Sequence, residues 1–90
     1  MTDRYELVVA RPAACALAEE LPEAVAVAVI GFITGPLLDE PRRVGRELRR
    51  ELAGVWAARR GTYRVLYRID DTRHEVTVVR IDHRRNVYRP

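Results

Sequence analysis

The sequence predicts an α+β fold of order β-α-α-β-β-β, in which two N-terminal helices lie on one face of a small antiparallel sheet. Two observations predict it. The N-terminal half holds alanine-rich stretches bounded by prolines, and the C-terminal half holds three alternating segments separated by short turns. Ninety residues suffice for one domain, residues 1–90, with a modest core.

The N-terminal half is expected to form one strand and two helices. Residues 5–11, YELVVAR, are valine-rich and stop at a proline, as a strand does. Pro12 suits the first turn of a helix over residues 12–21, whose apolar residues follow helical spacing. A second helix is expected over residues 22–40, with a break or kink at its Gly-Pro pair. Part of that stretch alternates, which leaves a buried strand open, but alanine content and length favour a helix.

The C-terminal half is expected to form a connector followed by three strands. The connector, residues 39–54, is polar and charged with few apolar anchors. The expected strands cover residues 55–59, 62–70 and 75–82. Short turns separate them, and the last residues, 83–90, read as a tail without apolar periodicity.

Charge is divided unevenly along the chain. Residues 1–41 carry two arginines against seven acids, a net charge of −5, and residues 42–90 carry fourteen arginines against six acids, a net charge of +8. Such a split predicts that the second half meets a polyanion, with an ordinary solvated surface as the alternative. All sixteen basic residues are arginines, which bind phosphate well but are poor general bases because they stay protonated.

Several classes of protein are excluded or disfavoured. The single cysteine, Cys15, rules out an internal disulfide and a paired-cysteine metal site, and neither a metal nor a cofactor is expected. The sequence has no run of eighteen apolar residues and no recognisable secretory signal. We therefore expect a cytoplasmic protein without a membrane partner.

The third expected strand, TYRVLYRID, separates into two faces. Tyr63, Val65, Tyr67 and Ile69 share one face, which should lie against the helices. Its other face carries Arg64, Leu66 and Arg68. Two helices cover only one face of a small sheet, so the arginine face should be open to a ligand or to water. Arginines interleaved with aromatic residues are typical of surfaces that bind single-stranded RNA.

The chain resembles the RelE branch of the RelE/ParE toxin superfamily, the toxins of bacterial toxin–antitoxin pairs. The matching residues are Leu52, Gly54, Trp56, Arg59 and Gly61, then YRVLY, HR and a terminal VYR. The order of elements also matches over nearly the whole chain. The resemblance implies a toxin that enters the ribosomal A site and cleaves the codon there, by attack of an RNA 2′-OH on its own phosphodiester.

The resemblance also implies the roles of individual residues. Arg59 and Arg64 match basic residues of the family's central hairpin, and Arg84 and Tyr88 match its C-terminal motif. Relatives often carry lysines at positions that align with Val55 and Ala57, so a family general base is missing here. His83 is the expected replacement, because its ordinary pKa of about 6.5 allows proton transfer in either direction.

Further arginines are expected to contact RNA, and the resemblance implies the partners. The additional RNA-binding candidates are Arg46, Arg49, Arg50, Arg60, Arg68 and Arg85. The implied partners are mRNA, the 70S ribosome and an acidic, helical antitoxin that covers the basic surface. Operator DNA would be contacted only through that antitoxin.

Two other functions stay open from the sequence. One is inhibition of DNA gyrase in the manner of ParE, on the same fold, which the missing lysines favour and the residues of the tail disfavour. The other is a catalytically weakened toxin-like domain that retains only antitoxin and operator binding.

Overall fold

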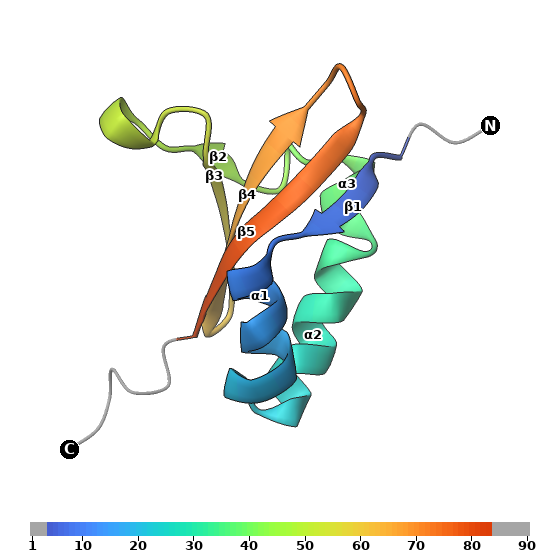
Figure 1. The fold of residues 1–90 in the computed structure, drawn as a ribbon, viewed down its shortest axis with the longest axis vertical. Coiled ribbons are helices and arrows are strands. Elements are labelled where there is room, and N and C mark those ends of the chain that lie inside the picture. Colours follow the sequence, from blue (N-terminus) through green and yellow to red (C-terminus); the bar gives the residue numbers. More distant parts are fainter. Residues whose placement is uncertain (1–3, 84–90) are drawn as a thin grey trace.

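A computed structural model describes residues 4–83 and shows a five-stranded sheet packed against helices (Figure 1). The elements are β1 (Glu6–Val9), α1 (Arg11–Cys15), η1 (Ala16–Glu20), α2 (Glu23–Ile33), α3 (Pro36–Asp39), β2 (Arg46–Glu47), η2 (Arg50–Leu52), β3 (Trp56–Arg60), β4 (Tyr63–Asp70) and β5 (Glu75–His83). The strands lie in the order β1-β5-β4-β3-β2.

The predicted α+β class is confirmed, and β3, β4 and β5 form the expected antiparallel meander. The antiparallel expectation is wrong for β1, which lies beside β5 and runs parallel to it. A parallel pair needs a long crossover, which the intervening helices and strands supply. The structure also adds β2, a two-residue strand paired with β3 inside the expected connector. Two residues are too few for alternation to reveal a strand.

Both predicted helices are present, with irregular ends. After α1 the chain makes a π-helical turn, η1, closed by the bond from Leu21 N–H to the Ala16 carbonyl oxygen (3.0 Å). Pro22 is the N-cap of α2, where its missing N–H costs no helical bond. α2 ends at Ile33 and Pro36 opens the short α3, which confirms the predicted break. No helix within residues 4–83 is long and apolar enough to cross a membrane.

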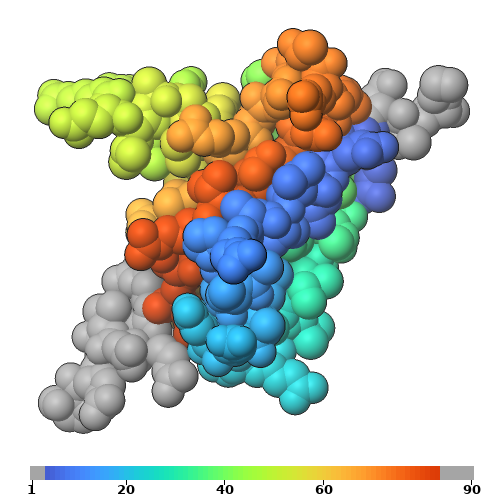
Figure 2. All heavy atoms as spheres, viewed as in Figure 1, coloured from blue at the N-terminus to red at the C-terminus, as the bar shows by residue number. Residues whose placement is uncertain are grey.

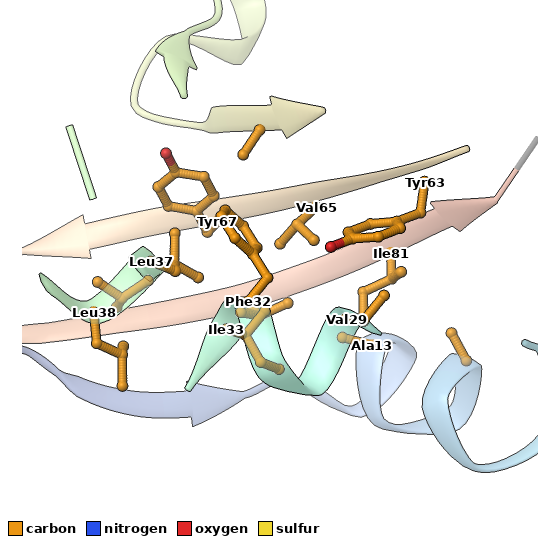
Figure 3. Close-up of a cluster of buried hydrophobic side chains, with 14 residues drawn as sticks. Ala13, Val29, Phe32, Ile33, Leu37, Leu38, Tyr63, Val65, Tyr67 and Ile81 are labelled. Atoms are coloured by element: carbon orange, nitrogen blue, oxygen red, sulfur yellow. The ribbon is translucent and has the colours of Figure 1, made fainter. Parts of the chain in front are cut away.

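The hydrophobic core lies between the helices and one face of the sheet (Figure 3). Tyr63, Val65 and Tyr67 of β4 are buried there, together with Val29 and Phe32 of α2. This alternation confirms the predicted inward face of the central strand. The intervening residues of β4 lie on the opposite face, which we call the open face.

A β-bulge interrupts β5 and changes which of its residues face the core. Leu66 pairs with Arg80, but the next residue of β4 pairs with Val78, so Val79 is an extra residue without a partner. Before the bulge, Val76 and Val78 are buried, and after it the buried residue is Ile81. The bulge therefore moves Arg80 to the open face, two residues before Asp82.

Candidate functional site

A row of charged side chains crosses three strands on the open face. Arg59 of β3 stands opposite Arg64 of β4, and Arg64 stands opposite Asp82 of β5. Residues that are directly paired across strands point to the same side of the sheet. Since Tyr63 and Val65, the neighbours of Arg64, belong to the core, the row lies on the face that the helices leave uncovered.

A groove of about 580 Å³ borders this row. Its lining residues are Arg43, Val44, Gly45, Arg46, Leu48, Ala57, Arg59 and Arg64. Residues 43–55, which we call the connector arm, project from the body of the molecule (yellow-green in Figure 2) and supply part of this lining. A smaller hollow of about 200 Å³ is lined by Arg59, Tyr63, Arg64 and Asp82. Both the arm and the sheet therefore present arginines to one concave space.

The base of the connector arm is fixed by hydrogen bonds and close packing. The Tyr67 hydroxyl donates to the carbonyl oxygen of Pro41 (2.6 Å), and the Arg42 guanidinium donates to the Asp71 carboxylate (2.6 Å). This bond from Arg42 lowers the pKa of Asp71. A Cβ atom on Gly45 would stand 2.6 Å from the backbone oxygen of Ala57, so the arm lies directly against β3. The arginines of the arm thereby hold a defined position beside the sheet.

One carboxylate, that of Asp82, holds two arginines. Arg64 donates from Nη2 to Asp82 Oδ2 (2.8 Å), and Arg80 donates from Nε to Asp82 Oδ1 (2.9 Å). Partial burial disfavours ionisation of Asp82, but the bonds from Arg64 and Arg80 outweigh it, so the pKa of Asp82 is lowered. Asp82 is therefore a carboxylate at neutral pH.

The remaining charge of the groove is positive and is not neutralised within residues 4–83. Arg46 and Arg59 have no carboxylate partner in that part of the chain. Arg59 also stands directly opposite Arg64, an arrangement of like charges that costs stability. A bound phosphate would remove this repulsion and would match the fork of donors on each guanidinium. The groove is therefore suited to an anionic ligand.

The structure brings together three of the arginines expected to contact RNA or its phosphates, namely Arg46, Arg59 and Arg64. Arg60 is on the other face, where its guanidinium lies 4.7 Å from the centre of the Phe32 ring. Arg49, Arg50 and Arg68 are exposed but do not line the groove. Arg84, Arg85 and Tyr88 lie outside the described residues.

His83 is not brought to the arginine groove. The register pairs it with Tyr63, so its side chain belongs to the face that the helices cover. Its Nδ1 is buried and has no hydrogen-bond partner in the described structure. The bulge at Val79 explains this placement, because unbroken alternation from Val76 and Val78 would put His83 on the open face.

Reading the sequence for arginines missed the acidic member of the row, Asp82. The sequence signal for it was the alternating order of residues 80–82, RID, which could have been matched with residues 63–65, YRV, on the neighbouring strand. Pairing Asp82 with Arg64 in this way requires knowledge of the register and of the bulge. Arg43, in the groove lining, was also missed because the connector carried no periodic pattern. Among residues 4–83, no group of three or more His, Cys, Asp or Glu residues is placed to hold a metal ion.

Comparisons with known proteins place the chain in a family. A family described as the ParE toxin of the type II toxin–antitoxin system parDE matches residues 14–88. The chain is 56% identical over 70 residues to the toxin RelG of Mycobacterium tuberculosis, covering 78% of this chain and 80% of that one. It is 48% identical over 71 residues to the toxin RelE of the same organism, covering 79% of this chain and 73% of that one.

A solved structure agrees with these relatives. The fold matches a chain of the RelBE2 toxin–antitoxin complex from Mycobacterium tuberculosis with a TM-score of 0.87 and 49% identity, over 90% of this chain and 99% of that one. Both the sequence comparisons and the arrangement of the elements therefore point to one assignment: this chain belongs to the ParE toxin family of type II toxin–antitoxin systems, as one of its RelE-like members.

Proposed function

We propose that this toxin is a ribosome-dependent mRNA endonuclease that cleaves codons in the ribosomal A site. The observation that carries the proposal is the groove that Arg59 and Arg64, paired across β3 and β4, line together with Arg46 of β2. An mRNA phosphate is the ligand that such a cluster of guanidinium groups would bind in a cytoplasmic protein of this family.

The proposed reaction is an internal phosphoryl transfer. The 2′-oxygen bonds to the adjacent phosphorus, its proton passes to a base, and the bond from phosphorus to the 5′-oxygen breaks. The products are a 2′,3′-cyclic phosphate and a free 5′-OH, which takes a proton from an acid. Arg59 and Arg64 would stabilise the negative charge that gathers on the phosphoryl oxygens in the transition state.

The base and the acid stay predictions. Arginines hold charge but do not accept the 2′-OH proton, because their pKa is too high. His83, Arg84 and Tyr88 were assigned from the sequence, and of these only His83 is described, on the covered face near the end of β5. Proton transfer by His83 would need the end of β5 to rearrange on the ribosome.

The proposed partners include an antitoxin. The related structure with 49% identity is a toxin–antitoxin complex, which supports a cognate antitoxin for this chain. The net charge of +8 over residues 42–90 favours an acidic segment over the groove. Such a segment would compete with mRNA for Arg46, Arg59 and Arg64, and DNA would be reached only through it.

Mapping of mRNA ends tests the proposal. Expression of the chain without an antitoxin should arrest growth and create new 5′ ends within translated codons. Arg64→Ala should reduce cleavage about 100-fold, as does the loss of one donor to a transition-state oxyanion elsewhere. Arg73→Ala, an exposed arginine in the turn before β5, is the matched control and should cleave normally. Undiminished cleavage by Arg64→Ala would show that the assigned groove is wrong.

Inhibition of DNA gyrase is the second candidate. The observation that favours it is the wall of the groove, where Ala57 stands at a position that relatives often fill with lysine. The match to a family named for ParE agrees with it. Growth arrest with an SOS response and intact mRNA would decide for gyrase. New 5′ ends within codons, without an SOS response, would decide for mRNA cleavage.

A further inference from the structure

Asp82 is an unexpected residue at the rim of a groove suited to anions. A carboxylate repels phosphate, yet Asp82 lines the smaller hollow together with Arg59 and Arg64. Its side chain is only 28% exposed, whereas that of Arg80 is 68% exposed, so the carboxylate is the more enclosed member of that ion pair. The pair between Asp82 and Arg64 is thus more enclosed than an ordinary surface ion pair.

The contacts of Asp82 limit what it does. Each of its two oxygens accepts a bond from a different arginine, Oδ2 from Arg64 and Oδ1 from Arg80. Both neighbouring cations disfavour protonation of the carboxylate, which makes it a poor acceptor for the 2′-OH proton. Arg64 uses only one donor, from Nη2, in this contact. A guanidinium has five N–H donors in a rigid plane, so fixing one edge orients the others.

We propose that Asp82 is a positioning residue: it fixes the Arg64 guanidinium so that its remaining donors point at the scissile phosphate, and it lowers the positive charge of the groove while doing so. The inference rests on the proposed mRNA cleavage for its effect on rate. It follows that Asp82 weakens RNA binding in the ground state and accelerates the chemical step, because a fixed guanidinium loses less entropy in the transition state.

The orientation of Arg64 is measured directly by NMR of arginine side chains. In the wild-type chain, the Nη protons of Arg64 should give separate signals, because hindered rotation about the Nε–Cζ and Cζ–Nη bonds makes their positions interconvert slowly. Asp82→Asn should average these signals at the same temperature. The matched control is Glu75→Gln, an identical loss of charge on the open face at the other end of β5, and it should leave the Arg64 signals unchanged.

The effect on affinity is measured with a single-stranded RNA oligonucleotide carrying 2′-O-methyl sugars, which has no 2′-OH to react. Asp82→Asn should bind it about fivefold more tightly, since one negative charge is removed at the edge of the groove. Glu75→Gln should change binding less than twofold. Unchanged or weaker binding by Asp82→Asn at low salt would overturn the proposal.

The effect on rate is measured with the full chain on mRNA-programmed ribosomes. For Asp82→Asn we expect half-saturation at a lower concentration of programmed ribosomes, together with a maximal cleavage rate reduced about tenfold. General unfolding would lower the maximal rate without lowering the half-saturating concentration. Asp82→Glu, which keeps the charge, should recover part of the rate. A rate equal to that of the wild type would overturn the proposal even if affinity rises.

The two proposals fail in different ways. If the wild-type chain leaves mRNA intact, the cleavage function fails, whereas slow exchange of the Arg64 signals that depends on Asp82 would still support the positioning role. If cleavage is present but Asp82→Asn leaves the Arg64 signals unchanged, cleavage stands and the positioning role of Asp82 is overturned.

Discussion

Tyr67 combines two roles at the centre of the molecule, since its ring fills the core and its hydroxyl holds the connector arm. The side chain is fully buried, and its hydroxyl donates to the carbonyl oxygen of Pro41 at 2.6 Å. Burial raises the pKa of Tyr67 to about 12, because the charged phenolate is poorly solvated there. The hydroxyl therefore stays protonated and donates at physiological pH. Its acceptor, Pro41, lies two residues before the connector arm begins.

Tyr67→Phe should lower the free energy of unfolding by about 1–2 kcal/mol at pH 7, because the Pro41 carbonyl loses its donor. Chemical denaturation measures this. Tyr63→Phe is the matched control on the same strand and face, and it should cost less because its hydroxyl bond to the Ala28 carbonyl is longer, 3.4 Å. Equal losses from the two variants would contradict the role assigned to Tyr67.

The same residue predicts how stability changes in alkali. The folded pKa of Tyr67, about 12, is above the unfolded value of about 10, so its contribution is complete below pH 10. It is lost as the pH rises from about 10 to 12, by on the order of 2–3 kcal/mol. Denaturation curves between pH 8 and pH 11.5 should show a shallower decline for Tyr67→Phe than for the wild type.

Only some of the individual residues of the candidate site were predictable from the sequence. The arginines at positions 59 and 64 follow from alternation in two neighbouring strands, so their shared face is implied once the hairpin between them is recognised. Arg60 was misplaced because it follows Arg59 directly, and in a strand that puts it on the opposite face, over Phe32. Which of Asp82 and His83 joins the arginines depends on the bulge, which single residues do not reveal.

Secondary-structure elements differ in how plainly the sequence encodes them. β3, β4 and β5 were predicted to within one residue at each end, because alternation over five to nine residues is a strong signal. The parallel pairing of β1 was missed, since four residues of mixed burial fit either edge and either direction. The bulge was missed because Val76, Val78, Val79 and Ile81 form a run of similar apolar residues in which a shift of pairing leaves no trace.

Gly45 is expected to be essential for placing the connector arm against β3. Gly45→Ala should cost about 1–3 kcal/mol in unfolding free energy, because its Cβ would stand 2.6 Å from the Ala57 carbonyl oxygen. Gly31→Ala is the control, since no atom lies within 4 Å of its Cβ, and replacing a helical glycine should stabilise by about 0.5–1 kcal/mol. Thermal or chemical denaturation of both variants measures the contrast, and two changes of the same sign would contradict the packing.

The whole molecule separates its charge between two regions. Acidic residues predominate in the half that builds β1 and the helices, and arginines predominate from the connector arm onward. Within residues 4–83, the groove gathers four of those arginines, at positions 43, 46, 59 and 64. The charge split predicted a polyanion partner from the sequence, but the location of the groove required the arm to pack against the sheet.

Binding of RNA should therefore weaken steeply with salt. Each phosphate neutralised by an arginine contributes about 0.7 to the slope of log K against log salt for a single strand. Arg46→Gln should reduce that slope by about 0.7 when binding of a single-stranded RNA is titrated from 50 to 200 mM salt. Arg73→Gln, outside the groove, should leave the slope unchanged, and an equal effect of both would indicate binding without a defined groove.

The single extra residue at Val79 sets the phase of the strand that follows it. A strand alternates between two sets of side chains, and one inserted residue exchanges the sets for every position downstream. In this chain the bulge places the carboxylate of Asp82 beside Arg64 and puts His83 on the face that the helices cover. If β5 kept Val79 but paired without the bulge, His83 would replace Asp82 on the open face, whereas deletion of Val79 would leave both residues where they are. The pairing of one residue therefore decides whether a carboxylate or an imidazole stands beside Arg64.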